Sequence, residues 1–376
     1  MEINFSMIKF ISIRRNIITI FLLFLFSFGS FSQVDTINDL LKHSIAFESF
    51  KAENYKLPVK TIYMFGEYHS YYKSNDIAHA IFDKISNKGS TKLYLMESSR
   101  STEYFLEKYL KTNSSKVHYN QGSFDLFAYK KLKSTFKFIK ENYRSDTSVV
   151  FKSFDIEDNF NFALMALYDL LISSNNSSFT SEISKIKKSQ GVTKYSNEKN
   201  YEISRWVISQ FYSDTSKYQK NLKDDYGHYS EIIASLEKGI VVDSLMTKIP
   251  SNFSQTMAKR EFFLKLNIHK IVLESRSGAV FIHSGLVHIL DTGNYYGNES
   301  YQTVAEYLRQ TFGRENVCRV GIILLKEHND YYNQQIFNAG IIKKYSKAQK
   351  KKTSLIDLRY IQYLTRSKVD FAVFCK

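Results

Sequence analysis

Short apolar runs alternate with a helix pattern in the first part of this chain, and this alternation constrains the fold most. The runs cover residues 61–65, 92–96 and 149–154, which is the length of buried strands. Between the first two runs, Ile77, Ile81 and Ile85 lie on one helical stripe, which Ser74 is expected to cap and Gly89 to end. A strand, a helix and a strand in short succession predict a parallel sheet.

The later part of the chain adds a long helical stretch and then returns to strands. From about residue 159 to 275 the pattern is helical and more polar, which indicates a helical insertion. Apolar runs resume at residues 279–282, 318–325 and 370–374. A helix over about 303–311 separates the first two. We therefore predict an α/β fold formed as one domain by residues 33–376, with a mainly parallel central sheet flanked by helices.

The composition suits such a domain. Of the 376 residues, 43% are hydrophobic and 24% are charged, which is too apolar for a disordered chain and too charged for a polytopic membrane protein. Only two cysteines are present, Cys318 and Cys375, so a disulfide scaffold and a four-thiolate zinc site are excluded. Two buried thiols or one disulfide remain as alternatives.

Residues 1–32 have the pattern of a secretory signal peptide. Three basic residues precede an apolar run over 17–28, and Ser30 and Ser32 supply small side chains for cleavage before Gln33. The run is shorter than the ~20 residues of a membrane-spanning helix, which disfavours an uncleaved anchor. We therefore predict export through the secretory pathway, to the periplasm or the extracellular space.

The chain is strongly basic, with a formal net charge of +15. Its basic residues are spread along the sequence, apart from a lysine-rich segment at 343–352, and no nucleic-acid-reading motif accompanies them. We predict no nucleic-acid partner. Peripheral contact with an anionic envelope surface is the interaction that the charge favours.

Chemically capable side chains gather where the predicted strands end. They are Glu67, His69, Glu97, Asp155, His283 and His288. Taken alone, a carboxylate at a strand end more often caps the next helix, and a histidine more often supports the core. Ligands bind outside the carboxyl ends of parallel strands, however, so several such residues on one sheet edge predict a site there.

Four motifs, in this order, resemble a known superfamily. Residues 66–69 (GEYH) match a GExH turn, 95–97 (LME) a strand that ends in an essential glutamate, and 285–288 (GLVH) a GxxH turn. Residues 257–261 (MAKRE), followed by Asn267, match a helix that bears a functional arginine. The chain thus resembles the superfamily of erythromycin esterases, Tiki/TraB proteases and ChaN-like haem-binding proteins, and the resemblance implies the erythromycin esterase/ChaN-like fold. The first turn is one residue shorter than in the esterases, which leaves the branch open.

The resemblance implies a catalytic set of Glu67, His69, Glu97, Arg260 and His288. These residue types suit activated water, because a histidine beside a carboxylate is a general base and an arginine stabilises an oxyanion. We expect His288 to take or return a proton. His283, Asn267 and Asp155 are predicted to bind substrate.

The predicted activity is that of a secreted hydrolase that cleaves an ester, lactone or amide of a small molecule or peptide. The chain has no G-x-S-x-G, H-E-x-x-H, Walker or G-x-G-x-x-G motif, which disfavours serine-hydrolase, zincin and nucleotide-binding chemistry. A non-catalytic envelope protein that binds haem or iron is the alternative, implied by the ChaN-like branch.

Cofactor use has three candidate answers. Glu67, His69, Glu97 and His288 could hold Mn, Co or Zn, as the likeness to Tiki implies. Catalysis without a cofactor is favoured, because Arg260 would oppose a bound cation. Haem is the third candidate, since Tyr68, Tyr71 and Tyr72 flank His69 and both residue types can be axial ligands.

Overall fold

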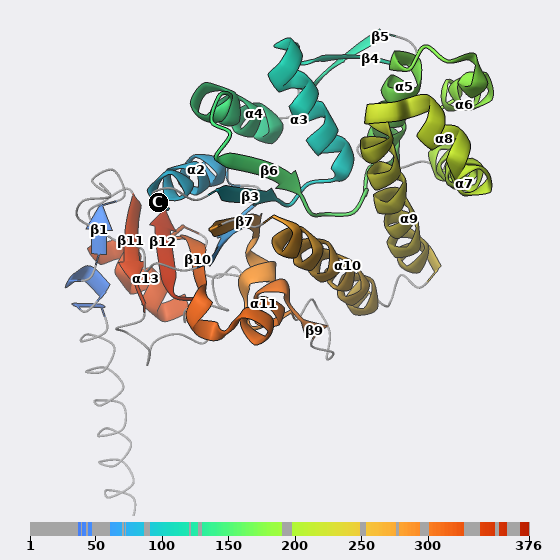
Figure 1. Ribbon diagram of the computed structural model, residues 1–376. Helices are drawn as coiled ribbons and strands as arrows, with labels where there is room; N and C mark the ends of the chain where they lie inside the picture. The colour runs from blue at the N-terminus through green and yellow to red at the C-terminus, as the bar shows by residue number, and fades with distance from the viewer. Residues whose placement is uncertain are drawn as a thin grey trace, which may run out of the picture. The chain divides into compact units, whose positions relative to one another are not determined.

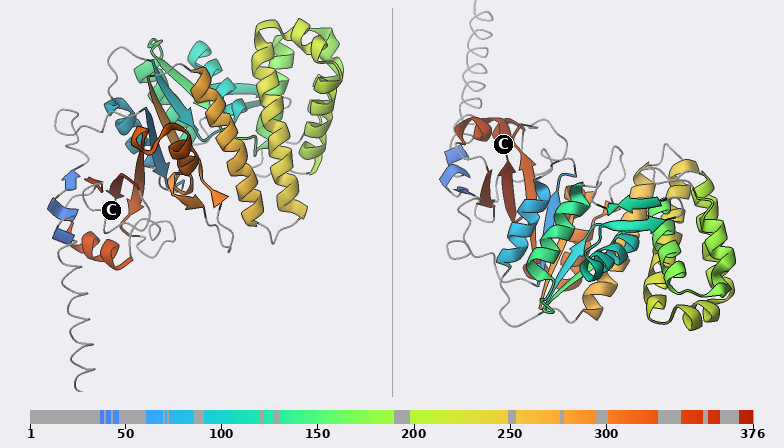
Figure 2. Two further views of the ribbon diagram at one scale, coloured as in Figure 1. Left: turned by 60° about the horizontal axis from the view of Figure 1, so that its bottom comes forward. Right: turned by 90° about the horizontal axis from the view of Figure 1, so that it is seen from above.

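The structure is a computed structural model of the chain (Figures 1 and 2). It describes residues 37–38, 40–42, 44–46, 61–69, 71, 73–85, 91–119, 122–126, 130–189, 198–248, 253–275, 278–293, 301–326, 339–349, 353–358 and 369–375. The predicted signal peptide and Gly89 lie outside the described residues. Two compact units make up the chain: one is Ala52–Ile322, and the other combines Met1–Lys51 with Ile323–Lys376.

A parallel sheet forms the centre of the larger unit. In spatial order its strands are β10 (Val317–Leu324), β2 (Ile62–Glu67), β7 (Ala279–Gly285), β3 (Lys92–Met96) and β6 (Val149–Ser153). All neighbours run parallel, with Ile62 opposite both Val280 and Val317. Every residue of β2 and β7 is buried, which explains their near-continuous apolar sequences. The prediction of an α/β fold with a mainly parallel sheet is confirmed.

Helices outside the insertion pack beside this sheet. They are α2 (Ser74–Lys84), α3 (Arg100–Thr112), α4 (Lys130–Tyr143) and α11 (Val304–Phe312). Ser74 was expected to cap α2, but Lys73 occupies the N-cap position and Ser74 is the first helical residue. Its hydroxyl instead donates a hydrogen bond to the carbonyl of Tyr68 at 3.1 Å, which ties the start of α2 to the turn after β2.

Most of the described residues between β6 and β7 are helical. The α-helices are α5 (Phe160–Ser173), α6 (Thr180–Ile186), α7 (Glu198–Ser213), α8 (Thr215–Leu222), α9 (Tyr226–Lys248) and α10 (Phe253–Glu274). Figure 2 shows several of them, in green and yellow, standing side by side as a bundle. Gly239 lets α9 approach the segment after β6, because a Cβ there would lie 1.9 Å from the carbonyl oxygen of Glu157.

Several short elements complete this unit. Two hairpins pair β4 (Lys116–Tyr119) with β5 (Gly122–Asp125) and β8 (Thr292–Gly293) with β9 (Tyr301–Gln302). The 3₁₀ turns are η3 (Ser177–Phe179), η4 (Lys223–Asp225), η6 (Leu286–Ile289) and η7 (Arg314–Asn316). In the described part of the chain, no helix combines the length and apolarity needed to cross a membrane.

The smaller unit contains an antiparallel sheet. Strand β11 (Thr353–Asp357) pairs with β1 (Ser44–Ala46) on one side and with β12 (Phe371–Cys375) on the other. Helix α13 (Ala339–Ala348) packs its buried Tyr345 against this sheet, where the hydroxyl lies 3.0 Å from that of Ser354. Cys375 on β12 is buried, as Cys318 is on β10 of the larger unit, which fits their prediction as late-strand residues.

Candidate active site

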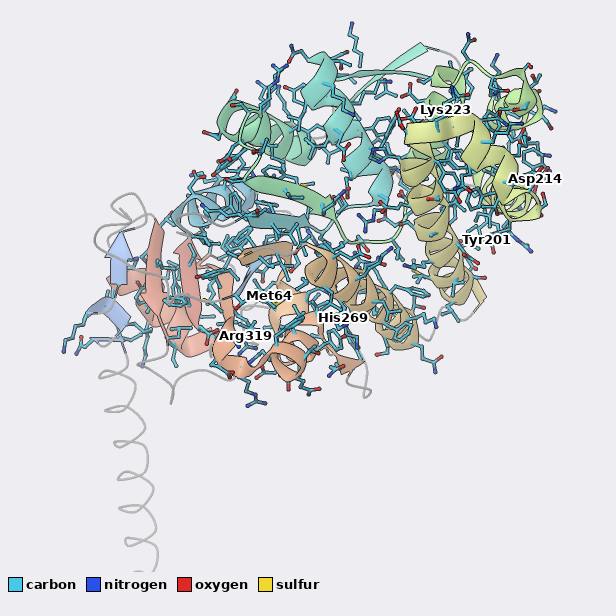
Figure 3. All side chains as sticks on the ribbon, viewed as in Figure 1. Met64, Tyr201, Asp214, Lys223, His269 and Arg319 are labelled. Atoms are coloured by element: carbon cyan, nitrogen blue, oxygen red, sulfur yellow. The ribbon has the colours of Figure 1, made fainter. Side chains whose placement is uncertain are left out.

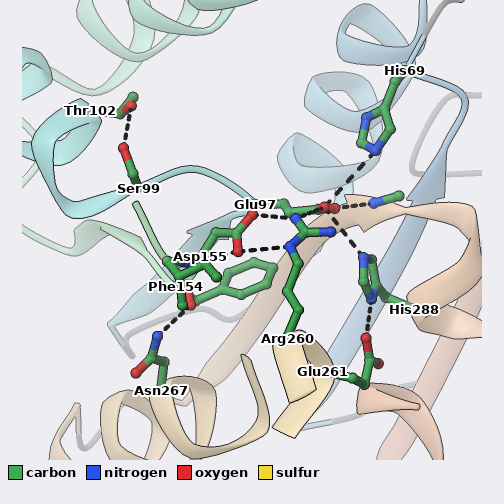
Figure 4. A network of polar contacts seen from close by, with 12 residues as sticks. His69, Glu97, Ser99, Thr102, Phe154, Asp155, Arg260, Glu261, Asn267 and His288 are labelled. Carbon is green, nitrogen blue, oxygen red and sulfur yellow. Dashed lines mark hydrogen bonds and ion pairs between the residues drawn. The ribbon is translucent and has the colours of Figure 1, made fainter. Parts of the chain in front are cut away.

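The carboxyl edge of the parallel sheet brings together the residues singled out in the sequence, of which Figure 4 shows His69, Glu97, Asp155 and His288. Glu67 ends β2, and Glu97 and Asp155 follow β3 and β6. His288 lies on η6, directly after β7. His283 was expected just beyond its strand but lies inside it, because β7 continues to Gly285, which pairs with Glu67 of β2.

His69 is the exposed histidine of the site. Its Nδ1 lies 3.0 Å from Oε1 of Glu67, and the imidazole is 59% exposed whereas the carboxylate is buried. Its Nε2 faces Glu97, with 3.9 Å to Oε1. Gly285 permits this position, because a Cβ there would lie 2.8 Å from Nε2 of His69. The turn therefore presents to solvent a histidine that a buried carboxylate orients.

His283 lies beneath that turn. Its Nε2 is 2.8 Å from Oε2 of Glu67, and its Nδ1 is 2.8 Å from the hydroxyl of Tyr94, which is fully buried on β3. His283 itself is 4% exposed. Both ring nitrogens thus contact protein groups, so the structure places this residue as a support for Glu67 and not at the surface that a substrate would reach.

Glu97 connects several elements. Its Oε1 accepts a hydrogen bond from Nη2 of Arg260 at 2.9 Å and lies 3.3 Å from Nε2 of His288, while its Oε2 accepts one from the backbone N–H of Gly285. Burial alone would raise the pKa of Glu97, but His288, Arg260 and His69 lower it well below the usual value. The carboxylate therefore stays charged and is a poor proton acceptor.

His288 is buried between two carboxylates. Its Nδ1 lies 2.6 Å from Oε2 of Glu261, opposite the contact with Glu97, and Oε1 of Glu261 accepts the backbone N–H of Val304 at the start of α11. Burial alone would lower the pKa of His288, but Glu261 and Glu97 raise it to about 10. At neutral pH His288 is thus a fixed cation that donates from both nitrogens, which differs from the proton-transfer role expected for it.

Arg260 brings the insertion into the site. From α10, its Nε donates to Oδ1 of Asp155 at 3.3 Å and its Nη2 donates to Oδ2. Nη2 also donates to Glu97. Within the described residues Nη1 has no hydrogen-bond partner, and the side chain is 21% exposed. Asp155 thus holds the guanidinium in place and leaves two N–H groups to meet a ligand.

Asn267 lies two turns along α10 from Arg260, as its spacing predicts. Its Nδ2 donates to the carbonyl of Phe154 at 2.8 Å, and its Oδ1 accepts from Nζ of Lys238 at 2.6 Å. The side chain is buried. Asn267 therefore holds the backbone that presents Asp155, and the structure gives it a supporting position.

Tyr94, Glu261 and Arg319 also belong to this arrangement but escaped the sequence analysis. Arg319, labelled in Figure 3, is fully buried on β10, and its Nη1 donates to the carbonyl of Ile289 at 3.3 Å and to Oδ1 of Asp291 at 2.5 Å. These bonds fix the chain directly after His288. The sequence did offer signals for these three residues: Tyr94 and Arg319 stand inside apolar strands, and Glu261 is next to Arg260.

The proposed metal ligands do not fit a cation in this arrangement. Among the described residues, no three His, Cys, Asp or Glu side chains are placed to hold a metal ion. Glu97 binds the guanidinium of Arg260, and His288 donates from both nitrogens. Two resident positive charges at the centre of the cluster would repel a divalent ion.

The tyrosines expected beside a haem are differently placed. Tyr68 is 8% exposed, so it faces the interior and is not presented beside His69 as an axial ligand. Tyr71 is half-buried, and Tyr72 lies outside the described residues. Haem binding stays a prediction from the sequence resemblance.

Comparison with known proteins extends the resemblance at the level of fold. No family model and no curated protein matches the chain. A solved structure of a Bacillus cereus protein is 15% identical with a TM-score of 0.58, covering 91% of this chain and 97% of that chain. The structure of a succinoglycan biosynthesis protein is 10% identical with a TM-score of 0.56, and the match covers 92% of this chain and 97% of that chain. A histidine mutant of the erythromycin esterase EreC, in its open conformation, is 12% identical with a TM-score of 0.51, covering 84% and 90%. The chain therefore shares the erythromycin esterase fold.

Proposed function

We propose that this protein is a hydrolase that cleaves an ester, lactone or amide of a small molecule or peptide with a water molecule activated by His69. The observation that carries the proposal is the His69–Glu67 pair. A buried carboxylate holds Nδ1 at 3.0 Å, while the imidazole is exposed and its Nε2 faces the charged cluster. In neutral imidazole a proton on Nδ1 leaves the lone pair on Nε2, which can accept a proton from water.

The reaction then follows from the groups around that water. The oxygen attacks the substrate carbonyl carbon as Nε2 takes the proton, and Nη1 of Arg260 donates to the oxyanion that forms. The intermediate collapses when the carbon–oxygen or carbon–nitrogen bond breaks and the His69 imidazolium returns its proton to the leaving group. His288 adds a fixed positive charge beside Glu97, and the products are an acid and an alcohol or amine.

Location and partners complete the proposal. The signal-like residues 1–32 support export to the periplasm or the extracellular space, and the net charge of +15 supports peripheral contact with an anionic envelope surface. The site chemistry needs no cofactor, and a small-molecule or peptide substrate is the expected partner.

The test is a substrate screen with matched histidine variants. The purified chain is assayed on 4-nitrophenyl esters, lactones and short peptides, and His69→Ala is expected to lower kcat about a thousandfold, within the range for loss of a general base. His228→Ala is the control, because His228 also pairs with a glutamate, Glu107, at 3.2 Å, but this pair joins α9 to α3 and includes none of the proposed catalytic residues. The proposal would be refuted if His69→Ala and His228→Ala both kept the wild-type kcat.

A further inference from the structure

A line of four side chains runs from the buried sheet to the exposed histidine. The hydroxyl of Tyr94 lies 2.8 Å from Nδ1 of His283, Nε2 of His283 lies 2.8 Å from Oε2 of Glu67, and Oε1 of Glu67 lies 3.0 Å from Nδ1 of His69. The strands β3, β7 and β2, which carry the first three, are adjacent in the sheet. The line therefore crosses the sheet in one direction.

The hydroxyl of Tyr94 determines the direction in which the hydrogen bonds along this line are donated. In the part of the chain that the structure describes, the hydroxyl of Tyr94 has one hydrogen-bond partner, Nδ1 of His283. Burial, with Glu67 nearby, raises the pKa of Tyr94 well above its usual value, so the hydroxyl keeps its proton. If Nδ1 of His283 carried a proton, that buried hydroxyl would lose its acceptor, which is costly inside a protein. Tyr94 therefore donates and Nδ1 accepts.

The remaining protons follow from that first bond. His283 accepts at Nδ1, so its proton lies on Nε2 and is donated to Oε2 of Glu67. Glu67, with one oxygen occupied, receives the Nδ1–H of His69 at the other. Each donor thus points toward the surface, and the neutral form of His69 has its proton on Nδ1 and its lone pair on Nε2.

We infer that Tyr94 and His283 are positioning residues: they hold the carboxylate of Glu67 in the orientation in which it accepts the Nδ1–H of His69, the tautomer that can act as a base. The inference rests on the proposed function and adds residues that do not reach the substrate. It also gives a role to the histidine in a central strand, since an apolar residue at position 283 could not contact both Tyr94 and Glu67 as His283 does.

A third histidine, His79, lies near His283 and Glu67. His79 on α2 is stacked on Phe138 with 3.9 Å between ring centroids, and it is almost fully buried. Burial, together with His283, lowers the pKa of His79 to about 3, against the opposing effect of Glu67. His79 is therefore uncharged at neutral pH, so it adds no positive charge behind Glu67.

Tyr94→Phe tests the inference by removing one hydroxyl from the line. Without the hydroxyl, Nδ1 of His283 loses the partner that fixes the ring, so the ring holds Glu67 less firmly against His69. We expect kcat to fall about fivefold, the factor of one buried neutral hydrogen bond, with KM unchanged. Nitrogen NMR of the histidines should show the single Nδ1–H tautomer of His69 in the wild type and a mixture in the variant.

Tyr345→Phe is the matched control, because Tyr345 is also buried and its hydroxyl lies 3.0 Å from Ser354, in the smaller unit. It should keep both the wild-type kcat and the His69 tautomer. His283→Phe should lower kcat at least about tenfold, because the catalytic histidine is displaced when Glu67 loses the residue that positions it.

The outcomes separate this inference from the proposed function. If the wild type cleaves an ester and Tyr94→Phe retains both kcat and the His69 tautomer, the positioning role is refuted while the hydrolase proposal stands. If no substrate is cleaved, the hydrolase proposal fails, and the tautomer measurement still decides whether Tyr94 sets the proton on His69.

Discussion

Two histidines at the same sheet edge differ in their exposure to solvent. His69 is 59% exposed, with Glu67 at 3.0 Å and Glu97 at 3.9 Å, whereas His288 is 2% exposed and lies between Glu97 and Glu261. The first is on the turn after β2 and the second on η6 after β7, two strands that are neighbours in the sheet. Residue type alone does not distinguish them.

The difference teaches that one histidine supplies chemistry and the other supplies charge. The pKa of about 10 keeps His288 protonated at neutral pH, so it balances the carboxylates that surround it. His69, in contact with solvent, can exchange protons with water and substrate. Mutations should therefore divide into those that affect turnover and those that affect the fold.

The largest effect should come from His288→Ala. Removing the cation leaves Glu97 and Glu261 buried with a partner missing, which costs about 3–5 kcal/mol in the free energy of unfolding. His69→Ala removes one donor from the buried Glu67 but leaves that carboxylate open to water, so it should cost less, about 1.5 kcal/mol. Urea denaturation of both variants measures the contrast, and equal stability losses would show that the two histidines have similar structural roles.

Glu67→Gln should come next, through turnover. The amide can present an N–H to one of the two histidine donors that now face the carboxylate, His69 and His283. That mismatch turns His69 away from its active tautomer, and we expect kcat to fall about a hundredfold, within the range for a misplaced general base. Circular dichroism checks that the variant is folded. A folded variant with the wild-type kcat would show that His69 does not need Glu67 to act as a base.

A smaller effect is expected from Gly285→Ala. The added Cβ would lie 2.8 Å from Nε2 of His69 and 3.4 Å from Oε2 of Glu97, and the exposed imidazole is the group that can move. We expect about a tenfold loss of kcat with the melting temperature nearly unchanged, because a small displacement of a catalytic group slows the reaction. A large loss of stability with normal kcat would mean that the backbone had moved instead.

The pH dependence of stability gives the smallest signal for each unit of pH. His288 has a folded pKa of about 10 against an ordinary value of 6.5, so its contribution is fully present below pH 6.5 and is lost as the pH rises through 10. Within this window the free energy of unfolding should fall by at most about 1.4 kcal/mol per pH unit. Denaturation at pH 7, 8 and 9 should show a shallower slope in His288→Ala, and identical slopes would contradict the raised pKa.

The sheet was predictable because its signal is local. The run at 92–96 coincides with β3, since consecutive apolar residues in a buried parallel strand need no distant partner to be recognised. The end of β7 was misjudged at His283 because the polar residues there look like a turn. Pairing with β2 carries the strand two residues further, and that pairing is a long-range contact.

The sequence predicted which residues form the site better than it predicted the role of each residue. Arg260 was identified from a motif, yet its partner Asp155 is 105 residues away, and only the fold brings them together. Tyr94 was hidden because a tyrosine in an apolar strand normally signals core packing. The protonation of His288 depends on two carboxylates from different elements, which no local pattern reveals.

Glu97 has a consequence for how this protein can change during evolution. One carboxylate contacts the backbone of β7, the imidazole on η6 and the guanidinium on α10. A loop that bears one of these groups cannot be replaced alone without disturbing the others. Helices α6, α7 and α8 contribute none of these groups, so their sequences are free of this constraint, while the segments that meet at Glu97 should change together or stay fixed.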